Sequence, residues 1–253
     1  MKRTVRTALL VGLLVVFGHG CGLDKELTVG VETGIRPLAY EERGQLKGFE
    51  VDLWKALAKE AGLKYRFKPM SAGDIIRAVE HKEIDVGLAA LTITKERKKN
   101  AEFSIPYMTG GLRIMTRSGD TSVQSPNQLK NKVVATRIGT TGYRYASYVK
   151  GVREVRAYPD IEAAIQALRK GEVDAVLFDE PIARMYAAGE RSGVGLSGRV
   201  LTKEQYGIML TKGSPYTGRV NNALRELGKN GEYERIYIRW FRQMPDGIPG
   251  KKG

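Results

Sequence analysis

One arginine near the start of a helix is the first residue in this sequence that suggests chemistry. In "LTITKERKK" (91–99), Thr94 is a good helix N-cap, which places Arg97 on the third residue of the helix. A helix N-terminus already carries a partial positive charge, so cations there cost free energy. Either the segment is a solvated basic face, or Arg97 binds an anion beside backbone N–H groups that have no partner.

A carboxylate and a glycine-threonine turn are further candidates, each with a plain structural alternative. Asp179 in "LFDEP" precedes Glu180 and Pro181, which is also the position of an ordinary N-cap. The turn in "RIGTTGY" (137–143) could present backbone N–H groups at a helix start, or be only a turn. The residues alone leave both alternatives open.

The sequence gives no support for metal binding or for nucleophilic catalysis. The two histidines are His19, in the N-terminal apolar segment, and His81, alone on a predicted helix. With Cys21, the only cysteine, they do not make a metal-binding spacing. No nucleophile–base set or phosphate loop is present, so we expect no metal, no cofactor and no catalytic residue.

The N-terminus has the pattern of an export signal. Lys2, Arg3 and Arg6 precede the ten-residue apolar run "ALLVGLLVVF" (8–17), which is too short to span a membrane comfortably. We predict a signal peptide over 1–20. Cys21 resembles the acylated cysteine of bacterial lipoproteins, although Gly18 departs from that motif; ordinary cleavage to a periplasmic protein is the alternative.

The basic charge does not indicate nucleic acid. The chain has 253 residues and a net charge of +14, and removal of 1–20 takes away three cations and no acids, leaving +14 − 3 = +11. Lysines and arginines are scattered, without the interleaved aromatics of single-strand binders. For an exported protein this charge favours solubility or attraction to an anionic membrane surface.

Short apolar runs alternate with amphipathic segments, which is the rhythm of βαβ units and a parallel sheet covered by helices. We expect strands at 27–31, 64–69, 84–91, 132–136, 153–158, 173–178 and 206–210. We expect helices at 48–63, 74–83, 142–150, 160–171, 180–189, 214–231 and 232–241, with a helix start at Ser125–Pro126. A Gly-rich loop is expected at 192–198, and a frayed tail at the C-terminus.

The rhythm breaks near 107–112 and 202–206, which divides the chain into two α/β halves of similar size. Two halves joined by thin connections form a cleft, and clefts between domains are common sites for small ligands.

Three stretches carry a family resemblance: "GFEVDLWKALAKEAGLKYRFKPM", "IDVGLAALTITKERKKNAEFSIPY" and "EVDAVLFDEP". They resemble the bacterial extracellular solute-binding proteins of family 3, which feed polar amino acids to ABC transporters, and the glutamine-binding members above all. The likeness runs collinearly from about Leu27 to Phe241. It implies a type II periplasmic-binding-protein fold, with lobe 1 from 24–110 plus 205–245, lobe 2 from 112–203, two hinge strands and a flexible tail at 246–253.

The resemblance also implies how the head group of an amino acid is held. Arg97 matches the arginine that clamps the α-carboxylate, and Asp179 matches the acid that pairs with the α-amino group. Thr92 would offer an N–H to the carboxylate and a hydroxyl to the amino group, Thr141 an N–H to the carboxylate, and Ala90 a carbonyl to the amino group. Arg97 and Asp179 on different lobes would then recognise a zwitterion.

The residues expected to select the side chain of the ligand depart from the family pattern. Ile35 and Ala72 stand where two aromatic residues usually sandwich the ligand, and Phe178 stands where the glutamine binder has histidine. Glu32 and Arg137 keep an acid and a base; they could hydrogen-bond a carboxamide, or pair with each other and leave a smaller pocket. A polar, glutamine-like L-amino acid is favoured.

The resemblance therefore predicts a non-enzymatic, monomeric component of an ABC importer that meets a permease and is exported, with a lipid on Cys21 as its membrane anchor. Two alternatives share the scaffold. Cyclohexadienyl dehydratases carry a general-acid glutamate three residues after the aspartate matching Asp179, where this chain has Ile182 and Glu180 is expected to point elsewhere. A ligand-sensing module keeps the pocket; no transmembrane or signalling segment is expected after residue 241.

Overall fold

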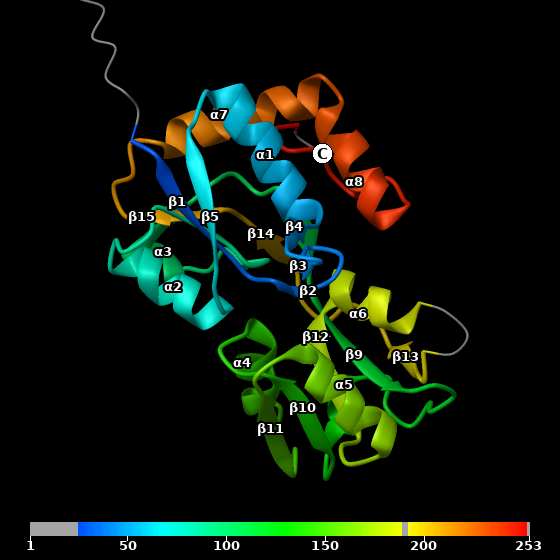
Figure 1. Ribbon diagram of the computed structural model, residues 1–253. Helices are drawn as coiled ribbons and strands as arrows, with labels where there is room; N and C mark the ends of the chain where they lie inside the picture. Colours follow the sequence, from blue (N-terminus) through cyan, green and yellow to red (C-terminus); the bar gives the residue numbers. More distant parts are fainter. Residues whose placement is uncertain (1–24, 189–191, 252–253) are drawn as a thin grey trace, which may run out of the picture.

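The computed structural model describes residues 25–188 and 192–251 and forms two lobes, each with a five-stranded sheet (Figure 1). In Figure 1 the upper lobe is coloured blue through cyan to teal-green, and again orange to red, because both ends of the chain build it. The lower lobe is green to yellow and comes from the middle of the chain. This confirms the predicted two-lobed α/β fold. The predicted signal peptide and Cys21 lie outside the described residues.

The sheet of the first lobe is mixed. Its strands run in the order β5 (Tyr65–Pro69), β1 (Leu27–Val31), β6 (Val86–Leu88), β15 (Met209–Thr211) and β7 (Ala101–Phe103). β1 pairs in parallel with β5 and β6, while β15 is antiparallel to β6 and β7. All five residues of β1 are buried, as expected for a parallel strand that is covered on both faces.

Helices flank this sheet, and two of them have clear end signals. The helices are α1 (Phe49–Ala61), α2 (Ala72–Glu80), α3 (Arg97–Asn100), α7 (Thr217–Lys229) and α8 (Glu232–Phe241). The hydroxyl of Ser71 caps α2 by accepting the N–H of Asp74, and Gly62 ends α1 in the left-handed conformation. α1 packs against α7 and α8. The small sheet β2 (Gly34–Ile35), β3 (Ala39–Glu42) and β4 (Gln45–Lys47) precedes α1.

The second lobe repeats this plan. Its strands run in the order β11 (Glu154–Tyr158), β10 (Val133–Arg137), β12 (Ala175–Asp179), β9 (Leu112–Arg117) and β13 (Val194–Ser197). Its helices are η1 (a 3-10 turn, Pro126–Leu129), α4 (Thr141–Tyr148), α5 (Ile161–Lys170) and α6 (Glu180–Ala187). β10 and β12 are parallel and buried throughout, and their carboxyl ends point toward the first lobe (Figure 1).

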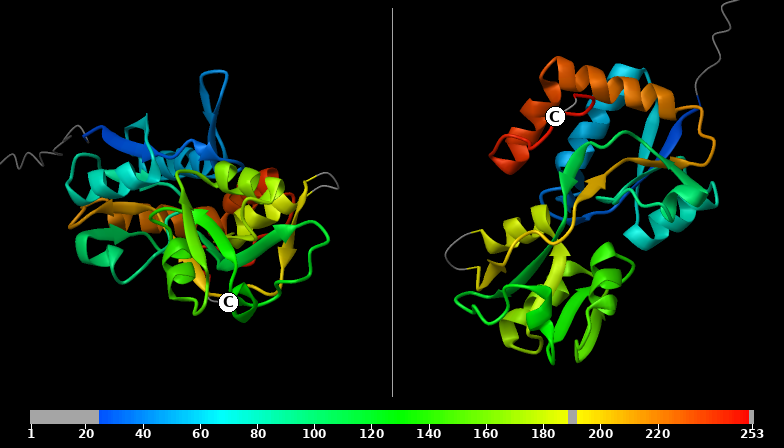
Figure 2. Two further views of the ribbon diagram at one scale, coloured as in Figure 1. Left: turned by 90° about the horizontal axis from the view of Figure 1, so that it is seen from below. Right: turned by 180° about the vertical axis from the view of Figure 1, so that it is seen from behind.

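Two short strands connect the lobes. β8 (Met108–Gly110) and β14 (Glu204–Tyr206) pair antiparallel, at the two places where the sequence rhythm breaks. The right-hand view of Figure 2 shows both connections passing between the lobes.

Several elements differ from the sequence-based prediction. The Gly-rich segment 192–198 was predicted as a loop, but it contains β13, which pairs with β9. The strand predicted at 206–210 is divided into β14 and β15 around Gly207, where a Cβ would press on Ile93 and Phe103. Short strands such as β7 and β8 gave no periodic signal, because three residues are too few to show a period of two.

Part of the C-terminal segment packs against the first lobe. Where a frayed tail was predicted, Ile248 packs against the core and Pro249 is buried. A Cβ on Gly228 of α7 would lie 2.6 Å from the carbonyl oxygen of Pro249, so α7 and this segment approach closely.

The hinge also contains a close backbone approach at Gly111, between β8 and β9. A Cβ there would lie 1.9 Å from the carbonyl oxygen of Thr202. We expect Gly111→Ala to lower the free energy of unfolding by about 1–3 kcal/mol, because the two hinge connections must separate to admit the methyl group. Urea unfolding monitored by circular dichroism measures this.

Gly218→Ala is the matched control for that substitution. Gly218 lies in α7, and a Cβ there meets nothing within 4 Å. A helical alanine is expected to leave stability unchanged or raise it by up to about 1 kcal/mol. Equal stability of the two variants would contradict the role given to Gly111.

Candidate functional site

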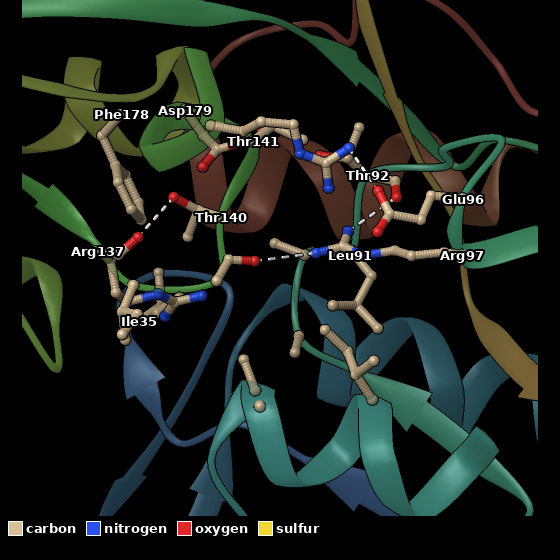
Figure 3. A pocket seen from close by; sticks show the side chains of 18 of the residues that line it. Ile35, Leu91, Thr92, Glu96, Arg97, Arg137, Thr140, Thr141, Phe178 and Asp179 are labelled. Atoms are coloured by element: carbon tan, nitrogen blue, oxygen red, sulfur yellow. Dashed lines mark hydrogen bonds and ion pairs between the residues drawn. The ribbon is translucent and has the colours of Figure 1, made fainter. Parts of the chain in front are cut away.

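A cavity of about 410 Å³ lies between the two lobes (Figure 3). Nine of the ten predicted ligand-binding residues line it: Ile35, Ala72, Ala90, Thr92, Arg97, Arg137, Thr141, Phe178 and Asp179. The tenth, Glu32, is not in the wall but forms an ion pair with Arg137. Residues far apart in the sequence and drawn from both lobes therefore meet at one cavity.

Arg97 reaches the cavity from the first lobe. The hydroxyl of Thr94 accepts its backbone N–H at 3.2 Å, which is the capping contact predicted, although the regular helix α3 begins only at Arg97. Nη1 donates to the carbonyl of Thr92 at 2.9 Å, and Nη2 donates to that of Gly139 in the second lobe at 3.5 Å (Figure 3). Burial lowers the pKa of the guanidinium, and the charge of Asp179 opposes this. Both acceptors are neutral, so the cation is positioned but not neutralised by them.

Asp179 reaches the cavity from the second lobe, at the end of β12. Asp179 does occupy the N-cap position of α6, but its side chain makes no capping hydrogen bond, so the carboxylate is directed to other partners. One carboxylate oxygen accepts the hydroxyl of Tyr206 at 2.8 Å. Burial, and then the charge of Glu204, raise the pKa of Asp179 to about 6, while the Tyr206 hydrogen bond and Arg137 oppose the rise.

Glu32 and Arg137 form a largely buried ion pair that crosses the lobes, with 2.6 Å between Oε1 and Nη1. Burial raises the pKa of Glu32, and Arg137 opposes this. The Arg137 guanidinium carbon lies 5.6 Å from the centroid of the Phe178 ring. The second oxygen of Glu32, Oε2, is buried and makes no hydrogen bond of standard geometry, although the backbone N–H of Ala72 is near enough to oppose the rise in the Glu32 pKa. Of the two alternatives left open by the sequence, the internal pair is the one formed.

Two threonines line the cavity near the hinge. Thr92 lies on the segment after β6, and Thr141 is the first residue of α4. A Cβ on Gly142 would lie 3.0 Å from the carbonyl oxygen of Leu177, so glycine lets the start of α4 sit close to β12. The hydroxyls of Thr92 and Thr141 both donate to Glu204, at 2.9 and 3.0 Å.

Ala90 lines the cavity in a left-handed conformation, with a φ of 49°. Its N–H donates to Oε1 of Glu50 at 3.0 Å, and the hydroxyl of Tyr107 donates to the same oxygen at 2.6 Å. Burial raises the pKa of Glu50 to about 7. A buried hydrogen-bonded acid thus helps hold the backbone of Ala90 in this uncommon conformation.

Residues 27–243 match the model of the bacterial extracellular solute-binding proteins, family 3. The chain belongs to this family. It is 31% identical over 219 residues to the L-cystine-binding protein TcyJ of Escherichia coli, with 85% of this chain and 82% of that protein covered. It is 29% identical to the ABC transporter glutamine-binding protein GlnH of Bacillus subtilis, covering 88% and 83%. The solved structure of an ancestral arginine-binding protein bound to arginine is 38% identical, with a TM-score of 0.80 and 85% and 98% covered.

These relatives are all named as binding proteins. At the position where the dehydratases carry their general acid, Ile182 is buried and lines the cavity. Glu180 is ion-paired with Arg184 on α6. Within the described residues, no three His, Cys, Asp or Glu side chains gather as metal ligands. No helix in that part of the chain has the length and apolar character to cross a bilayer.

Sequence reasoning missed four charged or polar residues of this site. Glu96 and Arg144 both line the cavity and form an ion pair across the lobes at 2.6 Å, while Glu204 and Tyr206 hold site groups from the hinge strand β14. Glu96 and Arg144 are 48 residues apart in the sequence, so no local pattern indicated that they would pair. Glu204 and Tyr206 lie where the alternation of strands and helices in the sequence breaks. The break indicated a connection between the two halves, but not which residues these two side chains contact.

Tyr206 supplies a test of the electrostatics at Asp179. Its hydroxyl stabilises the ionised carboxylate, so Tyr206→Phe is expected to raise the pKa of Asp179 above its value of about 6. Carbon-13 NMR titration of the aspartate carboxyl signals measures the shift, with assignment by Asp179→Asn. Tyr216→Phe, remote from the cavity, is the control. A pKa of Asp179 that stays the same or falls in Tyr206→Phe would contradict the assignment.

Proposed function

We propose that this solute-binding protein captures a polar L-amino acid, glutamine-like in its side chain, and delivers it to the permease of an ABC importer. One observation carries the proposal: a guanidinium from the first lobe and a carboxylate from the second, Arg97 and Asp179, line the same cavity. The names of the relatives, which concern cystine, glutamine and arginine, support a polar amino acid as the class of ligand.

Arg97 and Asp179 recognise the two poles of the zwitterion. The α-carboxylate receives two parallel hydrogen bonds from the planar guanidinium of Arg97, a geometry that lysine lacks. The backbone N–H groups of Thr92 and Thr141 complete its site, the latter at a helix start. The α-ammonium group pairs with Asp179 and with the carbonyl of Ala90.

Glu32 and Arg137 select the side chain. Arg137 lines the cavity, and its remaining N–H groups donate to the carbonyl oxygen of the ligand's side chain, while Glu32 behind it holds the guanidinium in place. A carboxamide supplies such an acceptor without a charge, which favours glutamine. Because the pair is neutral overall, it gives less attraction to a cationic side chain than an unpaired acid would. Ile35, Ala72 and Phe178 provide the apolar wall.

Closure follows from a ligand that touches both lobes. The moving bodies are 24–110 with 205–245 and 112–203, and β8 and β14 are the hinge. A ligand held by Arg97 and Asp179 together contacts both bodies only when the cleft is shut, so it selects the closed state. In this proposal Cys21 carries the lipid that keeps the protein at the membrane, near its permease.

Calorimetry against the twenty L-amino acids tests the ligand and the clamp. We expect heat of binding with L-glutamine. Arg97→Ala should weaken it by roughly 30-fold or more, because losing a buried charged partner costs about 2–5 kcal/mol. Arg97→Lys keeps the charge but not the paired hydrogen bonds, so an intermediate loss is expected. Lys98, the exposed neighbour of Arg97, gives the control: the affinity of Lys98→Ala should stay within about threefold of wild type.

Absence of binding to every amino acid would reject the proposed function. Unaltered binding in Arg97→Ala would reject the clamp but leave the class of ligand standing. Binding of L-arginine or L-cystine in preference to L-glutamine would correct the side-chain assignment alone.

The affinity should depend on pH through Asp179. Its pKa is about 6 without ligand, and a protonated carboxyl cannot pair with ammonium, so below pH 6 binding must displace a proton. Affinity is therefore fully present at pH 8, falls as the pH drops through 6, and is about tenfold lower at pH 5. The ligand's own α-groups do not titrate in this range. Asp179→Asn, weak at every pH, should lose this dependence; equal wild-type affinity at pH 8 and pH 5 would contradict it.

A further inference from the structure

Glu204 stands behind the wall of the cavity, at the point where the two lobes meet. It lies on hinge strand β14 and is 9% exposed. Three threonine hydroxyls donate to its carboxylate: Thr92 and Thr141 to Oε2 at 2.9 and 3.0 Å, and Thr202 to Oε1 at 3.1 Å. Thr92 belongs to the first lobe and Thr141 to the second, and both line the cavity (Figure 3).

These bonds fix where the hydroxyl hydrogens point. A carboxylate only accepts hydrogen bonds, and a hydroxyl has a single hydrogen to donate. With that hydrogen directed at Glu204, the oxygens of Thr92 and Thr141 can offer only lone pairs to a molecule in the cavity. Without Glu204 the same hydroxyls could rotate and act as donors.

We propose that Glu204 is a specificity-determining residue: by holding both threonine hydroxyls as acceptors, it makes the site require a cationic α-amino group on the ligand. The inference rests on the proposed function and assigns a role to a residue that does not line the cavity itself. Glu204 acts through Thr92 and Thr141, so it is a positioning residue and not a ligand contact.

The count of donors and acceptors supports this assignment. An ammonium group has three N–H donors and no acceptor. Asp179, the carbonyl of Ala90 and the hydroxyl oxygen of Thr92 give it three acceptors. A 2-oxo acid, or an acid without the amino group, supplies fewer donors and leaves buried acceptors unpaired, which binding sites tolerate poorly. The charge of Glu204 also acts on Asp179 and adds to the negative potential at this end of the cavity.

The test compares an amino acid with its deaminated analogue. Calorimetry first finds which of L-glutamine, L-arginine and L-cystine the wild type binds most tightly. That ligand is then compared with 4-carbamoylbutanoic acid, 5-guanidinopentanoic acid or 3,3′-dithiodipropionic acid, respectively, each measured by displacement at millimolar concentration. Glu204→Gln is expected to weaken the amino acid at least tenfold and to change the affinity of the analogue less than threefold. The preference for the amino group, which is the ratio of the two affinities, then falls by at least about threefold.

A matched acid elsewhere in the first lobe is the control. Glu102 on β7 accepts the hydroxyl of Thr217 at 2.7 Å and the N–H of Gly213 at 3.1 Å, away from the cavity. Glu102→Gln should leave both affinities at wild-type values. Thr92→Val gives an independent arm, because it removes the hydroxyl and keeps the N–H; it should weaken the amino acid more than the analogue.

A parallel loss for the amino acid and its analogue in Glu204→Gln would overturn the inference, since a merely structural role affects both alike. So would an amino-acid affinity within threefold of wild type. Should Glu204→Gln fail to fold, Thr92→Val decides: a parallel loss of affinity for the amino acid and its analogue in that variant overturns the inference. A wild type that binds none of the three amino acids would instead contradict the proposed function.

Discussion

Opposite charges that face one cavity from different lobes are the constraint around which this protein is arranged. Arg97 is held by carbonyl oxygens and Asp179 by a tyrosine hydroxyl, so neutral groups position each charge. Burying a charge without a counter-charge is unfavourable, and it is reflected in the lowered pKa of Arg97 and the raised pKa of Asp179. A zwitterion that reaches both groups relieves both penalties at once.

The hinge is chemically joined to this arrangement. β14 is one of the two short strands that connect the lobes, and it carries Tyr206, which donates to Asp179, and Glu204, which accepts the hydroxyls of Thr92 and Thr141. Under the proposed function, the residues that position the head-group contacts therefore lie on a strand that connects the lobes. A ligand in the cavity and the position of the lobes would then influence each other.

A second pair of opposite charges at the cavity is neutralised within the protein. Glu32 and Arg137 come from different lobes and neutralise each other, so this end of the cavity can stay closed without ligand charge. Ile35 and Ala72 line this cavity without aromatic rings, so under the proposed function selectivity depends on polar groups more than on stacking.

By itself, the sequence determined the helices and strands whose signals lie within a short stretch of the chain. Helices such as α1 and α5 and buried strands such as β1 have strong periodicity and end signals, and a collinear family resemblance pointed to Arg97 and Asp179. Only the tertiary structure decided that Arg97 and Asp179 line one cavity, that Glu32 pairs with Arg137, and that Glu204 backs the site. The strand β13, read as a loop, also depended on a distant partner, β9. The physical reason is the same throughout: contacts between residues far apart in the chain are set by how the lobes and sheets pack, and no local pattern records them.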